Sequence, residues 1–376
     1  MRPIYLLFLA IFTMSIGFGI MTPAVSLYSV LSFGVNEWEL GILGALTSVP
    51  YAIAPAFFGR HSDRIGRKPL VFAGAFIYGW VALAYIITPS FIFLAILRIL
   101  EGICFSLVWP ASEAWVGDLS NSGDRGRCIG NYSVAWSSGY MLGPFLLGII
   151  VTYTNVAYSF IMAASLVLAS VPLLLKVKAS VKKTPELGAT GAVGGGFATA
   201  AALFAMVVWG ISQLAYFFLL PAYTLGIGFP AAYAGYLIGL VTLFRTVVFV
   251  AYPRLVERLK GLMLPIGALL MAVSMLMTWA AMDIAFFALA SCLLGIAFGM
   301  IYAFSLGHML DRPAKGLYAG LFESSIGIGQ IVGPLTMGYV GFAISPSSPY
   351  LAMGMLGAAS AAAISGILVI AKRRAP

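Results

Sequence analysis

Residues 59–69 are Gly59-Arg60-His61-Ser62-Asp63-Arg64-Ile65-Gly66-Arg67-Lys68-Pro69, a short and densely charged stretch between two long apolar runs. Residues 41–58 before it and residues 70–97 after it contain no charged side chain. A hydrocarbon core takes about 20 apolar residues per helical span. The stretch is therefore predicted to be a short loop between two membrane-spanning helices. Gly59 and Gly66 suit tight backbone geometry, and Pro69 suits a first helical turn.

The composition of the whole chain agrees with a membrane protein. Of its 376 residues 61% are hydrophobic and only 9% are charged, whereas a soluble domain carries about 25% charged residues. A net charge of +9 would suggest nucleic acid as a partner of a soluble protein, but here the positive residues gather in particular loops. Cys104, Cys128 and Cys292 lie in apolar runs without metal-ligand spacing, and His61 and His308 stand alone. We expect buried thiols, no metal site, no cofactor and no nucleic-acid partner.

Apolar runs bounded by charged or turn residues predict an all-α membrane protein with twelve transmembrane helices. The predicted helices lie at about residues 4–31, 40–58, 70–88, 90–116, 127–152, 156–175, 198–225, 230–252, 262–282, 284–308, 316–342 and 348–370.

The distribution of basic residues predicts the orientation. If both termini are cytoplasmic, 19 of the 21 lysines and arginines fall in inner segments, and the outer loops hold only Glu37, Glu39 and Asp283. This bias follows the positive-inside rule. We therefore expect a multi-pass protein of the cell membrane, in contact with the lipid bilayer, with both termini in the cytoplasm.

The segment between residues 176 and 197 is rich in lysine and glycine and reads as a flexible linker. It divides the chain into a six-helix half at 1–178, a cytoplasmic linker at 179–197 and a second six-helix half at 198–376.

The two halves are related by an internal repeat. Gly126, Gly130, Gly139, Gly143, Pro144 and Gly148 recur, 190 positions later, as Gly316, Gly320, Gly329, Gly333, Pro334 and Gly338. The repeat therefore predicts two halves built on the same plan. The charged stretch repeats only in part: in the second half Glu257 is followed by Arg258, as Asp63 is followed by Arg64 in the first half.

The pattern Gly-x-x-x-Asp-Arg-x-Gly-Arg-Lys-Pro at 59–69 resembles the signature loop of the major facilitator superfamily of secondary transporters. The resemblance implies a fold of two pseudo-symmetric six-helix halves that normally works as a monomer. It also implies a conformational latch in which Asp63 meets the start of the helix near Lys315, while Arg67 pairs with Asp118. The latch residues carried over from the family are Gly59, Asp63, Arg64, Gly66, Arg67 and Asp118.

Residues 139–148 contain Gly139, Gly143, Pro144 and Gly148 at four- or five-residue spacing. Small residues at this spacing allow close helix packing, which is one interpretation. The same pattern resembles the antiporter motif of drug:proton exporters in the family, and this favours export.

Four charged residues lie well inside predicted spans, away from their ends: Arg98, Glu101, Arg245 and Glu323. Each costs roughly 2.5–3.5 kcal/mol at a helix centre. Arg98 and Glu101 are three apart and can pair on one helix face. Arg98-x-x-Glu101-Gly102 also resembles a family motif proposed for proton transfer, so Glu101 either carries a proton or neutralises Arg98. Glu323 has no basic residue within four positions, and it either accepts a proton or pairs with Arg245.

The family architecture implies a cavity lined by the first, fourth, seventh and tenth helices, with contributions from the fifth, eighth and eleventh. Each aromatic candidate there could instead face lipid or pack in the protein, but together they describe an aromatic, amphipathic cavity suited to apolar or cationic organic molecules. The candidate substrate-binding residues are Trp109, Asn131, Trp136, Tyr140, Trp209, Gln213, Tyr216, Tyr302 and Gln330.

Three functional classes are candidates for this chain. We expect a proton-coupled exporter of amphipathic small molecules that works by alternating access, with multidrug-type efflux as its activity. The alternative with the same fold is a proton-coupled or facilitated uptake carrier for a metabolite such as a sugar or an organic acid. A third class, a sensor or an intramembrane enzyme, is disfavoured because the sequence shows no metal cluster, nucleotide loop or appended soluble domain.

Overall fold

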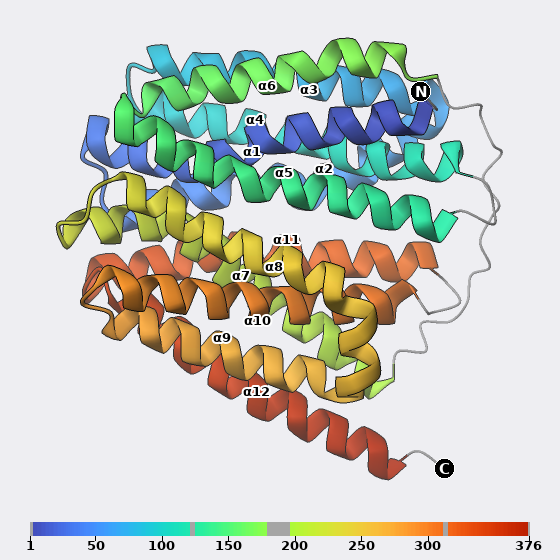
Figure 1. The fold of residues 1–376 in the computed structure, drawn as a ribbon, viewed down its shortest axis with the longest axis vertical. Coiled ribbons are helices and arrows are strands. Elements are labelled where there is room, and N and C mark those ends of the chain that lie inside the picture. Colours follow the sequence, from blue (N-terminus) through green and yellow to red (C-terminus); the bar gives the residue numbers. More distant parts are fainter. Residues whose placement is uncertain (1–2, 121–124, 179–195, 311–314, 375–376) are drawn as a thin grey trace. The chain divides into compact units, whose positions relative to one another are not determined.

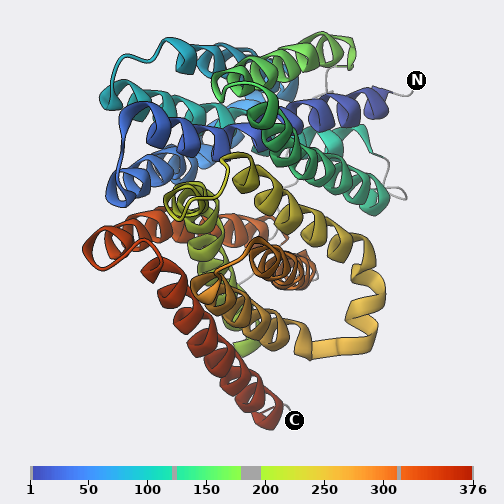
Figure 2. The same cartoon turned by 60° about the vertical axis from the view of Figure 1, so that its left-hand side comes forward.

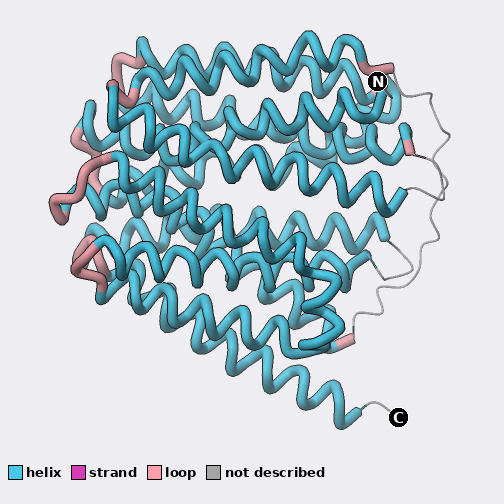
Figure 3. The backbone as a smooth tube through the Cα atoms, in the orientation of Figure 1, coloured by secondary structure: helices cyan, strands magenta, loops and turns pink. Residues whose placement is uncertain are grey.

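The computed structural model describes residues 3–120, 125–178, 196–310 and 315–374, without the side chains at a few helix ends such as 59–64 and 315–317. These residues form α-helices joined by short loops (Figure 3). The helices are α1 (Pro3–Phe33), α2 (Glu37–Ile65), α3 (Arg67–Ala84), α4 (Phe91–Leu119), α5 (Arg125–Tyr153), α6 (Ala157–Lys176), α7 (Phe197–Gly226), α8 (Ala232–Leu259), α9 (Met263–Ala280), α10 (Ile284–Leu310), α11 (Lys315–Ala343) and α12 (Ser348–Arg374). Two single turns of 3₁₀ helix, η1 (Tyr85–Ile87) and η2 (Lys260–Leu262), follow α3 and α8.

All twelve predicted helices are present, and within the described residues eleven of them are long and apolar enough to cross a membrane. The exception is α2, part of whose side chains lie outside the described residues. Large apolar side chains on these helices remain exposed, for example Ile53 at 73% and Trp80 at 56%. Such an apolar surface is expected where the solvent is lipid rather than water.

The predicted loop at residues 59–69 is much shorter than expected. Helix α2 continues to Ile65, and α3 begins at Arg67, so Gly66 is the only residue between them. Gly66 has φ of 100°, which L side chains rarely adopt. The predicted turn at Gly59 is wrong, because the backbone there is helical. Pro69 lies in the first turn of α3, where its missing N–H costs no hydrogen bond.

Acidic residues cap the starts of two helices. The Asn36 backbone N–H donates to the Glu39 carboxylate at 2.9 Å, and the Glu39 N–H donates to the Asn36 side chain at 3.0 Å. This reciprocal arrangement is a capping box at the start of α2. At α10 the backbone N–H of Phe286 donates to Asp283 at 2.9 Å. Both carboxylates thus lie at positive helix N-termini, where they are stabilising.

The chain forms two compact units. The first comprises residues 1–184 and 220–239, and the second comprises residues 185–219 and 240–376. In the first unit α1 packs on α5 and α6, α2 packs on α4, and α3 packs on α4 and α6. In the second unit α9 packs on both α10 and α12, and both ribbon views show α12 beside α9 (Figures 1 and 2). Residues 179–197, the predicted linker, lie almost entirely outside the described residues.

Glycines allow close helix contacts at equivalent places in the two units. In the first unit a Cβ on Gly139 would lie 2.6 Å from the Phe12 carbonyl oxygen of α1, and one on Gly143 would lie 2.6 Å from the Ile16 carbonyl oxygen. In the second unit Gly329 and Gly333 of α11 meet the backbone of α7 at Gly210 and Ile211 in the same way. The sequence repeat therefore corresponds to a repeated helix–helix contact.

Gly148 has a different neighbour from the two glycines that precede it in α5. A Cβ there would lie 2.6 Å from the Tyr236 ring of α8, and the Tyr236 hydroxyl is 3.2 Å from that of Thr152. Within the first unit the predicted motif therefore packs on two helices, with Gly139 and Gly143 on α1 and Gly148 on the first turns of α8.

We predict that Gly143→Ala destabilises the protein by about 1–3 kcal/mol, because backbone atoms of α1 occupy the space that the methyl group needs. The measurement is thermal unfolding of the purified protein in detergent. Gly130→Ala is the matched control on α5, because no atom from another part of the described chain lies within 4 Å of its Cβ position. Equal melting temperatures for the two variants would contradict the close contact.

Candidate functional site

The centre of the first unit holds a buried ion pair on α4. The guanidinium of Arg98 donates to the carboxylate of Glu101, and the two side chains are only 2% and 1% exposed. Arg98 Nε also donates to the Leu43 carbonyl of α2 at 3.0 Å. The three-residue spacing places both groups on one face of the helix. The predicted local pairing is therefore confirmed, and each charge offsets the insertion cost of the other.

Two tyrosines border this pair. Tyr78 of α3 and Tyr85 of η1 are both fully buried, and each interacts electrostatically with Glu101 and with Arg98. Neither residue was predicted from the sequence. Their seven-residue spacing places them on one face two turns apart, but only the packing of α3 on α4 turns that face toward the pair.

The ring of Tyr78 contacts a group of rings that we call the first aromatic cluster: Phe18, Phe105, Trp109, Trp136 and Tyr140. Trp109 lies at the centre, with ring-centroid distances of 6.4 Å to Trp136, 6.1 Å to Tyr140 and 5.9 Å to Phe18. Trp136 and Tyr140 are 6.1 Å apart. Helices α4 and α5 thus bring three of the predicted substrate-binding residues together, and Phe18 of α1 and Phe105 of α4 extend the group.

The second unit contains a corresponding group, the second aromatic cluster, made of Trp209, Phe249, Phe298, Tyr302 and Phe322. Tyr302 is central, with centroid distances of 5.5 Å to Trp209, 5.4 Å to Phe249 and 5.2 Å to Phe322. The Trp209 indole N–H donates to the Phe298 carbonyl at 3.2 Å. On α7, Gln213 lies one turn beyond Trp209, and its side chain accepts a hydrogen bond of 3.2 Å from Gln330 of α11.

Two other candidates lie apart from these clusters. Tyr216 is fully buried, hydrogen-bonds to Ser291 at 3.1 Å and packs against the Tyr350 ring. It belongs to the packing between α7, α10 and α12 and not to the second aromatic cluster. Asn131 is exposed, whereas the adjacent Tyr132 is buried with its hydroxyl 2.8 Å from that of Ser112.

The second unit also contains the remaining two intramembrane charges. Arg245 is only 4% exposed on α8, while Glu323 is half-buried on α11. Their roles in proton coupling stay predictions.

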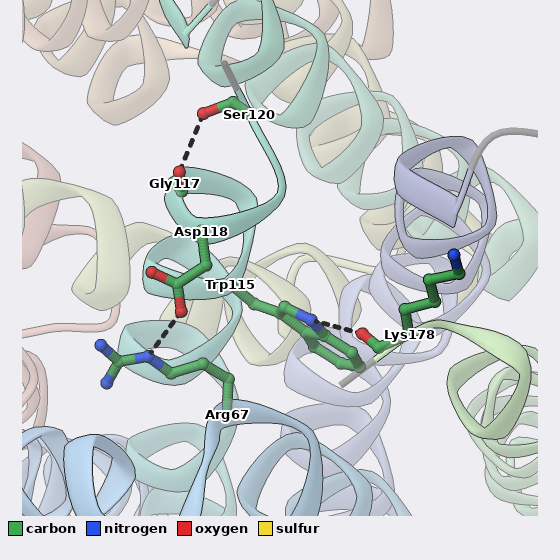
Figure 4. A network of polar contacts seen from close by, with 6 residues as sticks. All are labelled: Arg67, Trp115, Gly117, Asp118, Ser120 and Lys178. Carbon is green, nitrogen blue, oxygen red and sulfur yellow. Dashed lines mark hydrogen bonds and ion pairs between the residues drawn. The ribbon is translucent and has the colours of Figure 1, made fainter. Parts of the chain in front are cut away.

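The start of α3 contacts α4 and the end of α6. Arg67 forms an ion pair with Asp118 at 3.3 Å, as the resemblance implied, with side chains 16% and 19% exposed (Figure 4). The side chains of Gly59, Asp63 and Arg64, and the proposed Asp63 partner near Lys315, lie outside the described residues. The latch function therefore stays a prediction.

The adjacent Lys68 was not among the predicted functional residues, yet it caps a helix. Its ammonium group donates to the carbonyls of Leu175 at 2.6 Å and Val177 at 2.9 Å. The Trp115 indole N–H donates to the Lys178 carbonyl at 3.2 Å (Figure 4). A cation and an N–H donor thus satisfy carbonyls at the negative end of α6, where the last turn leaves them without helical partners.

We predict that Glu101→Gln destabilises the protein by about 3–5 kcal/mol, because it leaves the buried Arg98 charge without its counter-ion. The double variant Arg98→Met/Glu101→Met should regain most of that loss. Thermal unfolding in detergent measures both, with Glu257→Gln as an exposed control on α8. A double variant less stable than Glu101→Gln would contradict the pairing.

For Lys68→Met we predict a loss of about 1 kcal/mol, because a charged donor to the α6 carbonyls is removed. Amide hydrogen exchange at residues 171–177 should become faster. Lys176→Met changes an exposed lysine at the same helix end and should leave exchange unchanged. Equal exchange in the two variants would show that Lys68 does not cap α6.

Comparison with known proteins identifies the family. The family model described as Major Facilitator Superfamily matches residues 7–313. An uncharacterized MFS-type transporter of Methanocaldococcus jannaschii is 22% identical over 90% of this chain and 91% of its own length. The quinolone resistance protein NorA of Staphylococcus aureus is 25% identical over 39% of this chain and 38% of its own length.

Solved structures share the fold. A nucleoside transporter NupG variant superposes with a TM-score of 0.80 at 12% identity, covering 97% of this chain and 99% of that structure. A peptide transporter POT variant gives 0.79 at 14% identity, covering 98% of this chain and 95% of that structure. At such low identity the agreement concerns the fold alone. With the helices, the glycine contacts and the family match on residues 7–313 in agreement, the chain belongs to the Major Facilitator Superfamily.

Proposed function

We propose that this transporter exports amphipathic small molecules in exchange for protons, by alternating access of two pseudo-symmetric six-helix halves at 1–178 and 198–376. The observation that carries the proposal is the first aromatic cluster, because the rings of Trp109, Trp136 and Tyr140 meet in the same unit as a buried ion pair, with Trp109 about two turns beyond Glu101 on α4. Aromatic rings bind apolar or cationic molecules, and the Glu101 carboxylate in the same unit would provide a site for a coupled proton.

The second aromatic cluster supports the same class of substrate. Trp209 and Tyr302 present large rings, and the Gln213–Gln330 hydrogen bond adds neutral polar groups at the next turn. A site of rings and amides recognises molecules with an apolar body and few polar atoms. The partial similarity to a quinolone resistance protein is consistent with efflux.

The antiporter-like motif of Gly139, Gly143, Pro144 and Gly148 also supports export. Its glycines allow the close packing of α5 on α1 and α8, and the proposal assigns this packing a role in transport. Asp63, Arg67 and Asp118 would form the latch that holds one transport state. The protein would act as a monomer in the cell membrane, with both termini in the cytoplasm.

The second candidate is uptake of a metabolite such as a sugar or an organic acid. Arg245 favours it, since a guanidinium that is 4% exposed within a span is a suitable partner for an anionic substrate. Arg98 favours it less, because Glu101 already neutralises it.

The deciding experiment uses purified protein in liposomes with a pH-sensitive dye inside and an imposed proton gradient. For the wild type we expect lipophilic cations and aromatic dyes, but not sugars or organic acids, to trigger proton flux opposite to substrate movement. Glu101→Gln should abolish this flux, whereas the Glu257→Gln control should retain it. Glu323→Gln tests the other carboxyl in the same assay.

Two other results would contradict export. Proton flux in the same direction as the movement of a sugar or an organic acid would establish the second candidate. Substrate movement without any proton flux would make the protein a uniporter and leave the Arg98–Glu101 pair with a structural role only.

A further inference from the structure

The sequence contains only two glutamines, and the fold brings them together. Gln213 of α7 and Gln330 of α11 are 117 positions apart, and the Gln330 side-chain N–H donates to Gln213 Oε1 at 3.2 Å. Both side chains are partly buried, lie within apolar spans and belong to the second unit. An amide inside a span is costly, so two amides at one place indicate a role that apolar side chains could not fill.

Glycine contacts hold the two amides in place. A Cβ on Gly210 of α7 would lie 2.7 Å from the Ile326 carbonyl oxygen and 3.3 Å from the backbone nitrogen of Gln330. A Cβ on Gly329 would lie 2.9 Å from the Cα of Gly210. The backbones of α7 and α11 therefore touch beside Gln330 and one turn before Gln213. Because this contact already joins the two helices, the amides are positioned without relying on their own hydrogen bond.

Gln213 lies beside the second aromatic cluster. Trp209, one turn earlier on α7, donates to the Phe298 carbonyl of α10, whereas Gly210 meets α11. A helix turns about 100° per residue, which places Gln213 about 40° from Trp209 and about 60° from Gly210, between these two faces. The Trp209 ring is 5.5 Å from that of Tyr302. A molecule whose apolar body contacts this cluster can therefore reach the amides at the next turn.

The pair retains hydrogen-bonding capacity for a ligand. A glutamine amide has a carbonyl oxygen that accepts and an NH₂ group that donates. The bond between the two residues leaves the NH₂ group of Gln213 and the carbonyl oxygen of Gln330 without a partner among the described residues. If the two amides exchanged roles, one NH₂ group and one carbonyl oxygen would still be left over. The pair thus presents a donor and an acceptor next to each other.

The internal repeat shows that this position differs between the two halves. Gln330 follows Gly329 as Tyr140 follows Gly139, 190 positions earlier, and the two glycines make equivalent helix contacts. Tyr140 belongs to the first aromatic cluster, with its ring centroid 6.1 Å from that of Trp109. The first half therefore has a ring where the second half has an amide.

We propose that the Gln213–Gln330 pair selects substrates in which an N–H donor adjoins a C=O acceptor, as in a lactam or a carboxamide on an aromatic body. The ligand carbonyl accepts from the Gln213 NH₂ group, and the ligand N–H donates to the Gln330 carbonyl oxygen. The inference rests on the proposed function, because it names a substrate class for the candidate site in the second unit. A ligand without the N–H leaves a polar atom unpaired in apolar surroundings and binds less tightly.

The test uses the purified full chain in detergent and two matched probes, phenanthridinone and N-methylphenanthridinone. Both have the same fused rings and carbonyl group, but only phenanthridinone has a lactam N–H. Equilibrium dialysis, with binding to empty micelles subtracted, gives the dissociation constant of each probe. We expect the wild type to bind phenanthridinone about fivefold or more tightly than its methyl derivative.

The double variant Gln213→Met/Gln330→Met removes both amides at similar side-chain volume. Because both partners become apolar, its melting temperature should stay close to that of the wild type, while its preference between the probes should fall below about twofold. Ser291→Ala is the control, since it removes a different hydrogen bond of α7, the one of 3.1 Å to Tyr216, and should keep the wild-type preference. If the double variant does not fold, each single variant should lower the preference at least about twofold.

The results separate this inference from the proposed function. Equal binding of the two probes by the wild type, or an unchanged preference in the double variant or in both single variants, overturns the role of the pair. A loss in Ser291→Ala as large as that in the double variant also overturns it, because any loosened contact of α7 would then suffice. If tetraphenylphosphonium binds but neither lactam does, the lactam class is wrong and export of lipophilic cations stands. If none of the three binds, both proposals fail.

Discussion

A hydrocarbon layer offers no water to hydrogen-bond with a protein backbone, and the rest of this structure depends on that constraint. Each span must satisfy its own N–H and C=O groups, so the apolar runs form long α-helices. The backbone N–H and C=O groups that lack helical partners at the helix ends are then hydrogen-bonded by nearby side chains. The capping box of Asn36 and Glu39 serves the start of α2, and Lys68 serves the end of α6. The connection at Gly66 can be a single residue because glycine tolerates φ of 100°.

The same constraint governs how the helices meet. Without a hydrophobic driving force between apolar helices in lipid, association depends on close van der Waals packing. Gly139 and Gly143 let α5 approach the backbone of α1, and Gly329 and Gly333 do the same for α11 and α7. The repeat at an interval of 190 residues thus preserves a contact geometry. A packing role therefore accounts for both copies of the motif, and a transport role for the first copy requires functional evidence of its own.

Two of the charges inside the spans, those of Arg98 and Glu101, neutralise each other. The Arg98–Glu101 pair is neutral as a whole and buried, and Tyr85 interacts with both of its members. Tyr78 of α3 and Tyr85 of η1 border the pair, and the ring of Tyr78 also contacts Phe18 and Phe105 of the first aromatic cluster. The candidate proton site and the candidate ligand-binding rings of Trp109, Trp136 and Tyr140 therefore lie within one unit.

The sequence by itself determined the features that depend on local spacing. Apolar run length determined the twelve helices, and the three-residue spacing of Arg98 and Glu101 determined their pairing. The family pattern also indicated Arg67 and Asp118 as partners. The length of the connection at Gly66 could not be predicted, because helix continuation through a charged stretch depends on packing as well as on propensity.

Only the tertiary structure decided which distant side chains meet. Lys68 reaches carbonyls more than 100 residues away in the sequence, and Tyr78 reaches Phe18, Phe105 and the buried pair at once. It also separated Tyr216 from the other aromatic candidates on α7 and α10. The reason is geometric. Helical periodicity assigns a residue to a face, but the rotation and neighbours of each helix come from long-range packing, which a single sequence does not encode in any local pattern.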